Sequence, residues 1–220
     1  MNANGTGLKF LTERVRCSES GRKAVDASPT WSRDGSSLAF ERVCPELEGA
    51  FFNSDARPRH AGECLASSAC VIRMNADGTK LRQIVQAADA PTWSPSGREI
   101  AYMKGGGICF SGPNGGSQKV VSPGYDYLGT LDWSPNGRWL AFQEPAPGTI
   151  VLATRDRSSR ISLGRGGTPA FSPDGTQIAF GLFGEHRQRF RGRIFVMNTD
   201  GQGRRFLVAG ADPAWQRLPR

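Results

Sequence analysis

A phrase of twelve residues occurs four times along this chain, and no other feature constrains the fold as strongly. The copies read PTWSRDGSSLAF, PTWSPSGREIAY, LDWSPNGRWLAF and PAFSPDGTQIAF, at residues 29–40, 91–102, 131–142 and 169–180. Each holds a four-residue turn with Ser at its first position and Gly at its fourth, and three have Pro at the second. These are the preferences of a type I β-turn. With strand-forming residues on both sides, each phrase predicts a β-hairpin.

The strand after each turn is apolar at three consecutive positions, for example Ile178-Ala179-Phe180. A strand with one face in water would alternate instead, so continuous apolar character indicates that both faces are covered. The central residue is Ala in all four copies, which predicts that a neighbouring sheet approaches closely there.

A second pair of strands follows the hairpins. Residues 72–78 and 194–201 each read as a strand ending in an Asp-Gly turn, and 81–85 and 205–208 read as the strands that come next. The aromatic anchors of the units are Trp31, Trp93, Trp133, Phe171 and Trp215, which lie 62, 40, 38 and 44 residues apart. A period near 40 with four strands per unit is typical of a propeller blade. We therefore predict one all-β domain over residues 1–220, a β-propeller with blades beginning near 28, 90, 130 and 168.

The phrases PAFSPDGTQIAF and IFVMNTDGQGRRFLV resemble the WD-like propeller repeats of the TolB type. The resemblance covers nearly the whole chain except residues 13–27 and 43–69. It implies protein partners, a location in the periplasm or outside a bacterial cell, and usually six blades. It does not identify a partner, because propellers serve many functions.

The two ends of the sequence match different parts of a blade. Residues 1–6 align with Met74–Thr79, and residues 211–216 read as a first strand, so 1–12 and 211–216 form a partial blade. Either these ends join and close a ring of four full blades and one composite blade, or Met1 is internal to a longer propeller. We expect the second arrangement, since residues 1–10 also carry no signal-peptide pattern.

The departures from the minimal blade are predicted to lie on one face, where loops positioned by a rigid scaffold commonly bind partners. They are the insertion 43–69, the link 13–27, the link around Tyr125-Asp126-Tyr127, Pro145-Ala146-Pro147 and residues 185–191. The alternative is a set of diverged loops without a partner. Aromatic and Arg side chains are enriched at protein interfaces. The predicted binding residues are Phe51, Phe52, Arg57, Arg59, His60, Tyr125, Tyr127, His186, Arg187, Arg189 and Arg191.

Four of the five cysteines gather in or beside the insertion. Cys17, Cys44, Cys64 and Cys70 are disulfide candidates, which would fit an oxidising compartment, and three pairings are possible. A zinc site of Cys44, His60, Cys64 and Cys70 is the alternative, but no CxxC-type knuckle is present, so no metal is predicted. Cys109 falls in a predicted strand as a buried free thiol.

The sequence contains no GxSxG, HExxH or GxxxxGK[ST] motif, so we predict a protein that is not an enzyme and needs no cofactor. The turn residues Asp34, Asp77, Asp174 and Asp200 have a sufficient structural role, because Asp favours such turns through its side chain.

Three functions follow from these observations. The first is a protein-interaction or scaffold module that binds through the face carrying the insertion. The second is an accessory propeller of a peptidase or other hydrolase system. The third is binding of an acidic glycan through the basic rim, since the net charge is +8; nucleic acid is the weaker version because stacking aromatics are not interleaved with the basic residues. No apolar run approaches the roughly 20 residues of a membrane span, and the oligomeric state is open.

Overall fold

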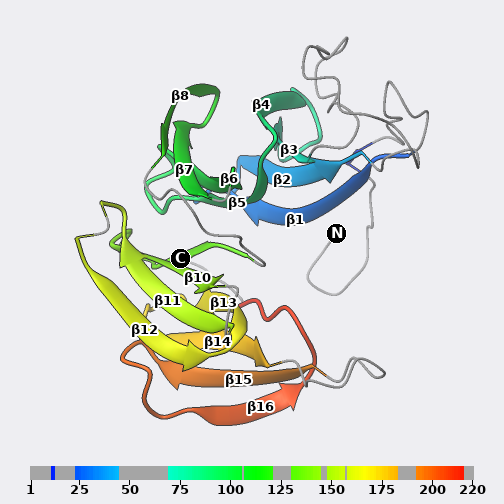
Figure 1. Cartoon of the computed structure of the whole chain (residues 1–220). Coiled ribbons are helices and arrows are strands. Elements are labelled where there is room, and N and C mark those ends of the chain that lie inside the picture. The colour runs from blue at the N-terminus through cyan, green and yellow to red at the C-terminus, as the bar shows by residue number, and fades with distance from the viewer. Residues whose placement is uncertain are drawn as a thin grey trace, which may run out of the picture.

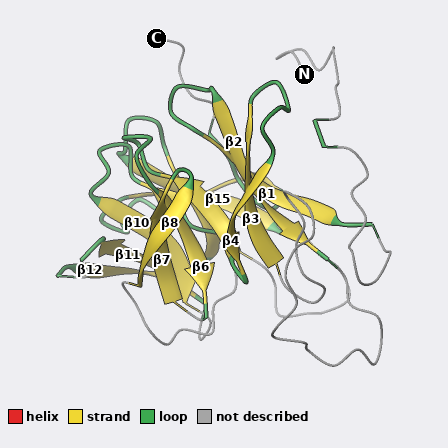
Figure 2. Ribbon diagram, turned by 90° about the horizontal axis from the view of Figure 1, so that it is seen from above, coloured by secondary structure: helices red, strands yellow, loops and turns green. Residues whose placement is uncertain are grey.

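The computed structural model describes residues 11–12, 23–44, 69–105, 107–120, 130–144, 148–156, 158–182 and 192–215. Within these ranges all regular structure is β, and sixteen strands form four antiparallel sheets of four strands. The sheets are arranged around a common axis as blades of a β-propeller (Figure 1). Figure 2, turned by 90° from that view, shows strands and loops only. No helix in the described ranges is long and apolar enough to cross a membrane. The predicted fold class is confirmed.

Each blade uses four consecutive strands in sequence order. Blade 1 comprises β1 (Val25–Trp31), β2 (Ser37–Val43), β3 (Ala69–Asn75) and β4 (Arg82–Gln86). Blade 2 comprises β5 (Asp89–Trp93), β6 (Ile100–Lys104), β7 (Gly107–Gly112) and β8 (Gly115–Val120). Blade 3 comprises β9 (Asp132–Trp133), β10 (Trp139–Glu144), β11 (Thr149–Thr154) and β12 (Arg160–Arg165). Blade 4 comprises β13 (Gly167–Phe171), β14 (Gln177–Leu182), β15 (Arg193–Asn198) and β16 (Arg205–Ala209). The first strands contact those of neighbouring blades, so they are innermost.

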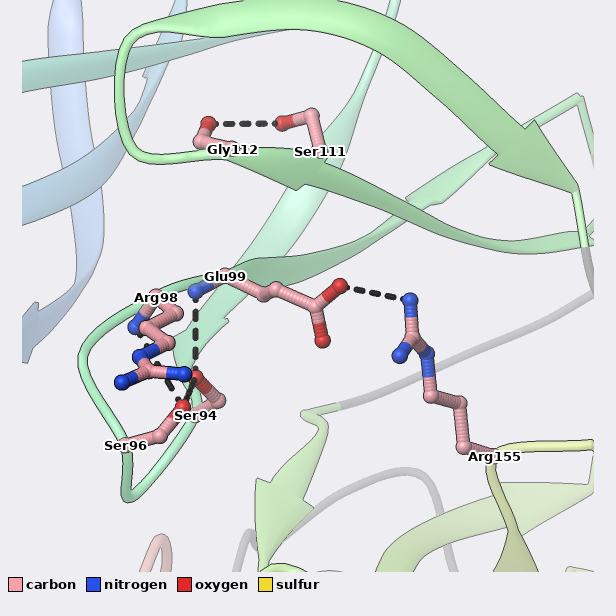
Figure 3. A network of polar contacts seen from close by, with 7 residues as sticks. All are labelled: Ser94, Ser96, Arg98, Glu99, Ser111, Gly112 and Arg155. Carbon is pink, nitrogen blue, oxygen red and sulfur yellow. Dashed lines mark hydrogen bonds and ion pairs between the residues drawn. The ribbon is translucent and has the colours of Figure 1, made fainter.

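The repeated phrase forms the predicted hairpin in every blade. In blade 2 the Gly97 amide donates to the Ser94 carbonyl oxygen at 2.9 Å, and the Ser94 amide donates to the Glu99 carbonyl oxygen at 2.9 Å. The Ser94 hydroxyl oxygen also accepts from the Glu99 amide at 3.1 Å (Figure 3). Gly97 has φ of +69°, which an L side chain adopts at a cost and glycine adopts freely. The Ser and the Gly are therefore both required by the turn.

The seams between blades are the hydrophobic core. The central alanines of the second strands, Ala39, Ala101, Ala141 and Ala179, are all buried, as predicted from the continuous apolar pattern. At the first seam, Trp93 of blade 2 packs with Ala39, Val71 and Val85 of blade 1. Each blade is thus stabilised mainly by burying apolar surface against the next one.

One aromatic anchor differs from the others. Trp93, Trp133 and Phe171 are 6–7% exposed, whereas Trp31 is 45% exposed. The three buried anchors each pack on the blade that precedes them in sequence. No complete sheet precedes blade 1 among the described residues, so Trp31 has no equivalent surface to cover it.

Leu11 packs against blade 1 beside the turn between β3 and β4. A Cβ built on Gly78, in the turn between β3 and β4, would lie 3.1 Å from the Leu11 carbonyl oxygen. The same relationship joins Gly115 of blade 2 to the Ile84 carbonyl oxygen of blade 1, at 2.8 Å.

The innermost strand of blade 1 begins earlier than predicted. β1 starts at Val25, so three residues of the predicted link 13–27 belong to a strand. A β-bulge between Ala27 and Thr30 makes this possible, with Ser28 at a φ of +50°. Ala90 and Thr168 occupy the same position in blades 2 and 4, at +47° and +45°. Each of these residues is followed by a Pro, which lacks the N–H needed for a regular strand. Strands accommodate Pro at bulges, so the bulge allows the strand to continue past it.

Candidate functional site

The predicted binding residues all lie outside the described residues. These are Phe51, Phe52, Arg57, Arg59, His60, Tyr125, Tyr127, His186, Arg187, Arg189 and Arg191. Cys17 and Cys64 lie outside them as well. The structure does define the strand ends that flank these loops. β2 ends at Val43 and β3 begins at Ala69, so the boundaries of the predicted insertion coincide with strand ends.

The antiparallel order of each sheet decides which end of the blade these connections leave from. First strands begin, and second strands end, at the end of the blade opposite to the Ser-x-x-Gly turns. We call the end with the insertion the loop face and the end with the turns the turn face. The candidate site is the part of the loop face where the insertion leaves blade 1. We call it the insertion root, and it consists of Asp26, Glu41, Arg42, Cys44, Cys70 and Asp89.

A buried ion pair stands at the centre of the insertion root. The Arg42 side chain is 1% exposed and that of Asp26 is 25% exposed. Arg42 Nε donates to Asp26 Oδ1 at 2.7 Å, and Arg42 Nη2 donates to Asp26 Oδ2 at 2.8 Å. This two-pronged geometry is the strongest that Arg and a carboxylate form. It fixes the start of β1 to the end of β2, directly before the insertion begins.

Contacts of an aromatic ring and of two cysteines also stabilise the insertion root. The Arg42 guanidinium lies over the Phe40 ring, 5.4 Å from its centroid. Cys44 and Cys70 are buried in a cluster with Phe40 and Ile72, against which Leu11 and Ala24 pack. Neither Cys44 nor Cys70 is a free thiol. The insertion thus starts and ends on residues that cannot move without opening the core.

Cys109 is a free buried cysteine on β7, as predicted. Burial raises the pKa of its thiol above the ordinary value, so the thiolate is disfavoured at neutral pH. A reactive or metal-binding role would need the opposite shift. Its place in the seam between blades 1 and 2 accounts for it as a packing residue.

The carboxyl groups of Asp89 in blade 2 and Glu41 in blade 1 interact electrostatically across the seam. Burial, and then the negative charge of Glu41, raise the pKa of Asp89 to about 6. Asp89 begins β5 of blade 2, and Glu41 lies near the end of β2 of blade 1. The pair therefore spans the seam at the loop face.

The sequence predictions missed Asp26, Glu41, Arg42 and Asp89 as site residues. The repeated phrase does contain a signal for two of them, Glu41 and Arg42. After Leu-Ala-Phe the first copy continues with Glu41-Arg42, whereas the fourth continues with Gly181-Leu182. Two charges at the end of a buried strand need partners. Asp26, sixteen residues earlier, could not be chosen as that partner without the strand register.

The acidic residues of the turns have the structural role predicted for them. Asp174 Oδ1 accepts from the Thr176 amide at 3.0 Å and from the Ser172 hydroxyl at 2.5 Å. Asp34, Asp77 and Asp200 each accept from a backbone amide two residues ahead. Among the described residues, no three His, Cys, Asp or Glu side chains form a group that could hold a metal ion.

Comparison with known proteins finds likeness at the level of structure. No family model and no curated protein sequence matches the chain. A putative TolB from Agrobacterium tumefaciens superimposes with a TM-score of 0.61 and 19% identity, covering 88% of each chain. TolB from Acinetobacter baumannii gives 0.63 and 16%, covering 90% of this chain and 50% of that one. A chain of a nidogen–laminin complex gives 0.61 and 12%, covering 87% and 67%.

The fold is that of a TolB-type β-propeller. The resemblance read from the repeated phrases is confirmed as a likeness of fold. At these identities it says nothing about which molecule the loop face contacts.

Proposed function

We propose that this chain is a non-catalytic, TolB-like β-propeller that binds a protein partner through its loop face, with the insertion 43–69 as the main contact. The buried Arg42–Asp26 pair is the observation that carries the proposal. A diverged loop without a function needs no special support. This loop leaves the sheet from a corner that is fixed by a two-pronged ion pair and by two buried cysteines.

Rigid support matters because binding costs the entropy of ordering the contacting groups. A long loop that is held at both ends loses less freedom on binding than one tethered loosely. Cys44 is the second residue of the insertion 43–69, and Cys70 directly follows it. We propose that Cys44 and Cys70 form disulfides with Cys17 and Cys64, and that the protein works in an oxidising compartment, the periplasm or the outside of a bacterial cell.

The engagement of arginines favours a protein partner over an anionic polymer. Six described arginines donate hydrogen bonds to other groups of the protein, which leaves them less available for a polyanion. They are Arg33, Arg42, Arg73, Arg155, Arg160 and Arg204. Propeller chains of the same fold occur in a nidogen–laminin complex, which is consistent with a protein partner.

The experiment replaces residues 45–68 by a short hairpin loop like the one that joins β6 to β7, where Lys104 pairs with Gly107. Proteins recovered with the intact chain and with the shortened chain are then compared by quantitative mass spectrometry. We expect the specific partner to be lost from the shortened chain. The matched control, Arg98→Ala with Arg138→Ala on the turn face, should retain it.

Circular dichroism and thermal melting establish that the shortened chain is folded. A folded shortened chain that recovers the same proteins as the intact chain would refute the insertion as the binding element. Loss of the partner from the turn-face control alone would move the site to the opposite face.

A further inference from the structure

One arginine lies at a seam position that is apolar in every other blade. Arg73 of β3 pairs with Ala39, the central alanine of β2. The residues that pair with the central alanines of blades 2, 3 and 4 are Phe110, Leu152 and Val196, and each is 1–2% exposed. Arg73 is half-buried at the same position. Blade 1 therefore places a charge in its seam with blade 2, where the other blades place a hydrophobic side chain.

Contacts from both blades orient the Arg73 guanidinium. Its Nη2 donates to the Ser37 hydroxyl oxygen of blade 1 at 2.9 Å, and its Nη1 donates to Asn114 Oδ1 of blade 2 at 2.6 Å. The group also lies over the Trp93 ring, 5.9 Å from its centroid. Ser37 is buried, whereas Asn114 is exposed. The guanidinium is thus held at the turn-face end of the seam, where solvent reaches one side of it.

The guanidinium of Arg73 has no carboxylate partner among the described residues. Three other arginines do form ion pairs there: Arg42, Arg155 and Arg160. Arg73 meets only neutral oxygen atoms, and its buried Nε–H has no acceptor in the described part of the chain. The carboxylates in the turns of blade 1, Asp34 and Asp77, accept from main-chain amides of their own turns. Because charges that leave water are favoured when they are paired, an anion beside Arg73 would be stabilised.

A second arginine lies directly opposite the first. Arg82 of β4 pairs with Arg73 across the two antiparallel strands. Directly opposite residues project from the same face of a sheet with their Cβ atoms about 5 Å apart, and like charges there repel each other. Arg82 is exposed and forms no ion pair with a described carboxylate. In blade 4 the same two positions hold Val196 and Arg205, so the repulsion is a property of blade 1.

The turn between β7 and β8 brings an uncharged donor to the same place. Asn114 points its Oδ1 at Arg73, which leaves its Nδ2 amino group to donate elsewhere. The next residue, Gly115, lies against β4, because a Cβ built on it would be 2.8 Å from the Ile84 carbonyl oxygen. Ile84 is two residues from Arg82 on that strand. The turn therefore holds Asn114 beside both arginines.

We propose that the turn-face end of the seam between blades 1 and 2 binds a phosphate or sulfate ion, free or carried by a small molecule, through Arg73, Arg82 and Asn114. We call these three residues the oxyanion site. Two guanidinium groups without a carboxylate match the charge of a tetrahedral dianion, and the planar fork of arginine N–H groups suits its oxygen atoms. Arg73 keeps its bonds to Ser37 and Asn114, since it has N–H groups left over for one small anion. The oxyanion site lies at the end of the blades opposite to the loop face, so it does not rest on the proposed function.

An NMR titration of the intact 220-residue chain with inorganic phosphate tests the oxyanion site, at about pH 8 and with ionic strength held constant by KCl. We expect saturable shifts of the amide signals of Asn114 and Gly115. Arg82→Ala should weaken binding by about tenfold or more, because it removes one of two charge-assisted partners. Arg205→Ala is the matched control, since it removes an exposed arginine from the same register position in blade 4 and should leave the affinity unchanged.

Arg73→Leu separates anion binding from a structural role of the arginine. Leucine is the residue of blade 3 at this position, so the variant should fold with a Tm no lower than that of the wild type in the absence of phosphate. Phosphate should raise the Tm of the wild type and not that of Arg73→Leu, because a ligand stabilises only a protein that binds it. Arg82→Ala changes an exposed residue and keeps the test decisive if Arg73→Leu does not fold.

Other anions test the chemistry of the oxyanion site. Sulfate should compete with phosphate, whereas acetate, with a single charge, should bind at least about tenfold more weakly. Phenyl phosphate tells the two sources apart: binding as tight as that of inorganic phosphate supports a group carried by a small molecule, and its exclusion supports the free ion. Shifts that grow without saturating, acetate binding equal to phosphate binding, or equal effects of Arg82→Ala and Arg205→Ala would each overturn the proposal. So would phosphate binding that Arg73→Leu leaves intact.

Discussion

Arg42 and Asp26 form a two-pronged ion pair whose two halves differ in exposure: the guanidinium is buried, while the carboxylate is reached by water on one side. Arg155 and Glu99 make a comparable contact at 2.5 Å across the turn face, with Glu99 29% exposed and Arg155 47% exposed (Figure 3). The two carboxylates are thus similarly exposed, but Arg42 is buried and donates two hydrogen bonds to its carboxylate, whereas Arg155 is exposed and donates one.

Asp26→Ala should therefore be much more destabilising than Glu99→Ala. Loss of Asp26 leaves a buried guanidinium without its carboxylate, and the free energy of unfolding should fall by roughly 3 kcal/mol. Loss of Glu99 removes an exposed pair and should cost less than about 1 kcal/mol. Urea denaturation of both variants measures the difference. Equal losses would mean that the burial of Arg42 contributes nothing to the pair.

The carboxyl pair of Asp89 and Glu41 predicts a pH dependence. Asp89 has a pKa of about 6 in the folded protein, above its ordinary value of 3.8. A raised carboxyl pKa means that the folded state favours the protonated form. This contribution to stability is fully present below the ordinary pKa and is lost as pH rises through about 6.

Asp89→Asn should therefore raise the free energy of unfolding at pH 7 by about 1–2 kcal/mol, after allowance for partial solvent screening. At pH 4 it should have little effect. Glu41→Gln should give a smaller change in the same direction, since Glu41 is the second cause of the shift. Urea denaturation at pH 4, 5, 6 and 7 tests this, and a constant difference between Asp89→Asn and wild type across that range would contradict it.

Substitutions at three turn glycines distinguish the cost of backbone strain from the cost of a clash between blades. Gly35, Gly97 and Gly175 have φ of +71°, +69° and +73°. A Cβ at Gly35 or Gly97 would meet nothing within 4 Å, whereas at Gly175 it would lie 3.3 Å from Pro135 Cδ of blade 3. Substitution by Ala should cost about 1 kcal/mol at Gly35 and Gly97. It should cost more at Gly175, and thermal melting that ranks Gly175→Ala as the mildest would be inconsistent with the seam geometry.

The proposed disulfides predict how many cysteines react with a thiol reagent before and after reduction. The chain has five, and the proposed disulfides use four, so only Cys109 should react with a thiol reagent after denaturation without reductant. Reduction should release four more. Mass spectrometry after alkylation reads both numbers. Protein prepared under oxidising conditions that shows five reactive cysteines before reduction would rule the disulfides out.

The parts of the fold that depend on local pattern could be predicted from the sequence. Ser94 and Gly97 specify a turn through their own hydrogen bonds and φ, and the apolar run around Ala101 specifies burial on both faces. The positive φ of Ser28 could not be predicted, because it comes from a bulge that depends on the pairing of β1 with β2. Arg42 and Asp26 likewise meet only through that register.

The turn between β11 and β12 is another feature that the sequence pattern does not predict. This copy lacks the Gly of the others, so its pattern does not predict the same turn there. Asp156 Oδ1 accepts from the Thr154 hydroxyl at 2.8 Å and from the Ser158 amide at 3.1 Å, which reproduces the Asp34 arrangement. Hydrogen bonds from these neighbours lower the pKa of Asp156 to about 2, as they do for Asp34. The side-chain bonds therefore hold this turn without the glycine.

Site-specific photo-crosslinking tests the central claim, binding through the loop face, most directly. A photoreactive amino acid is placed at Phe52, Arg59, Tyr127 or Arg189 on predicted loop-face connections, and at Ser36, Arg98 or Arg138 on the turn face. The account predicts that loop-face positions crosslink one specific partner protein and that turn-face positions do not. Crosslinks to the same partner from the turn face, with none from the insertion, would contradict it.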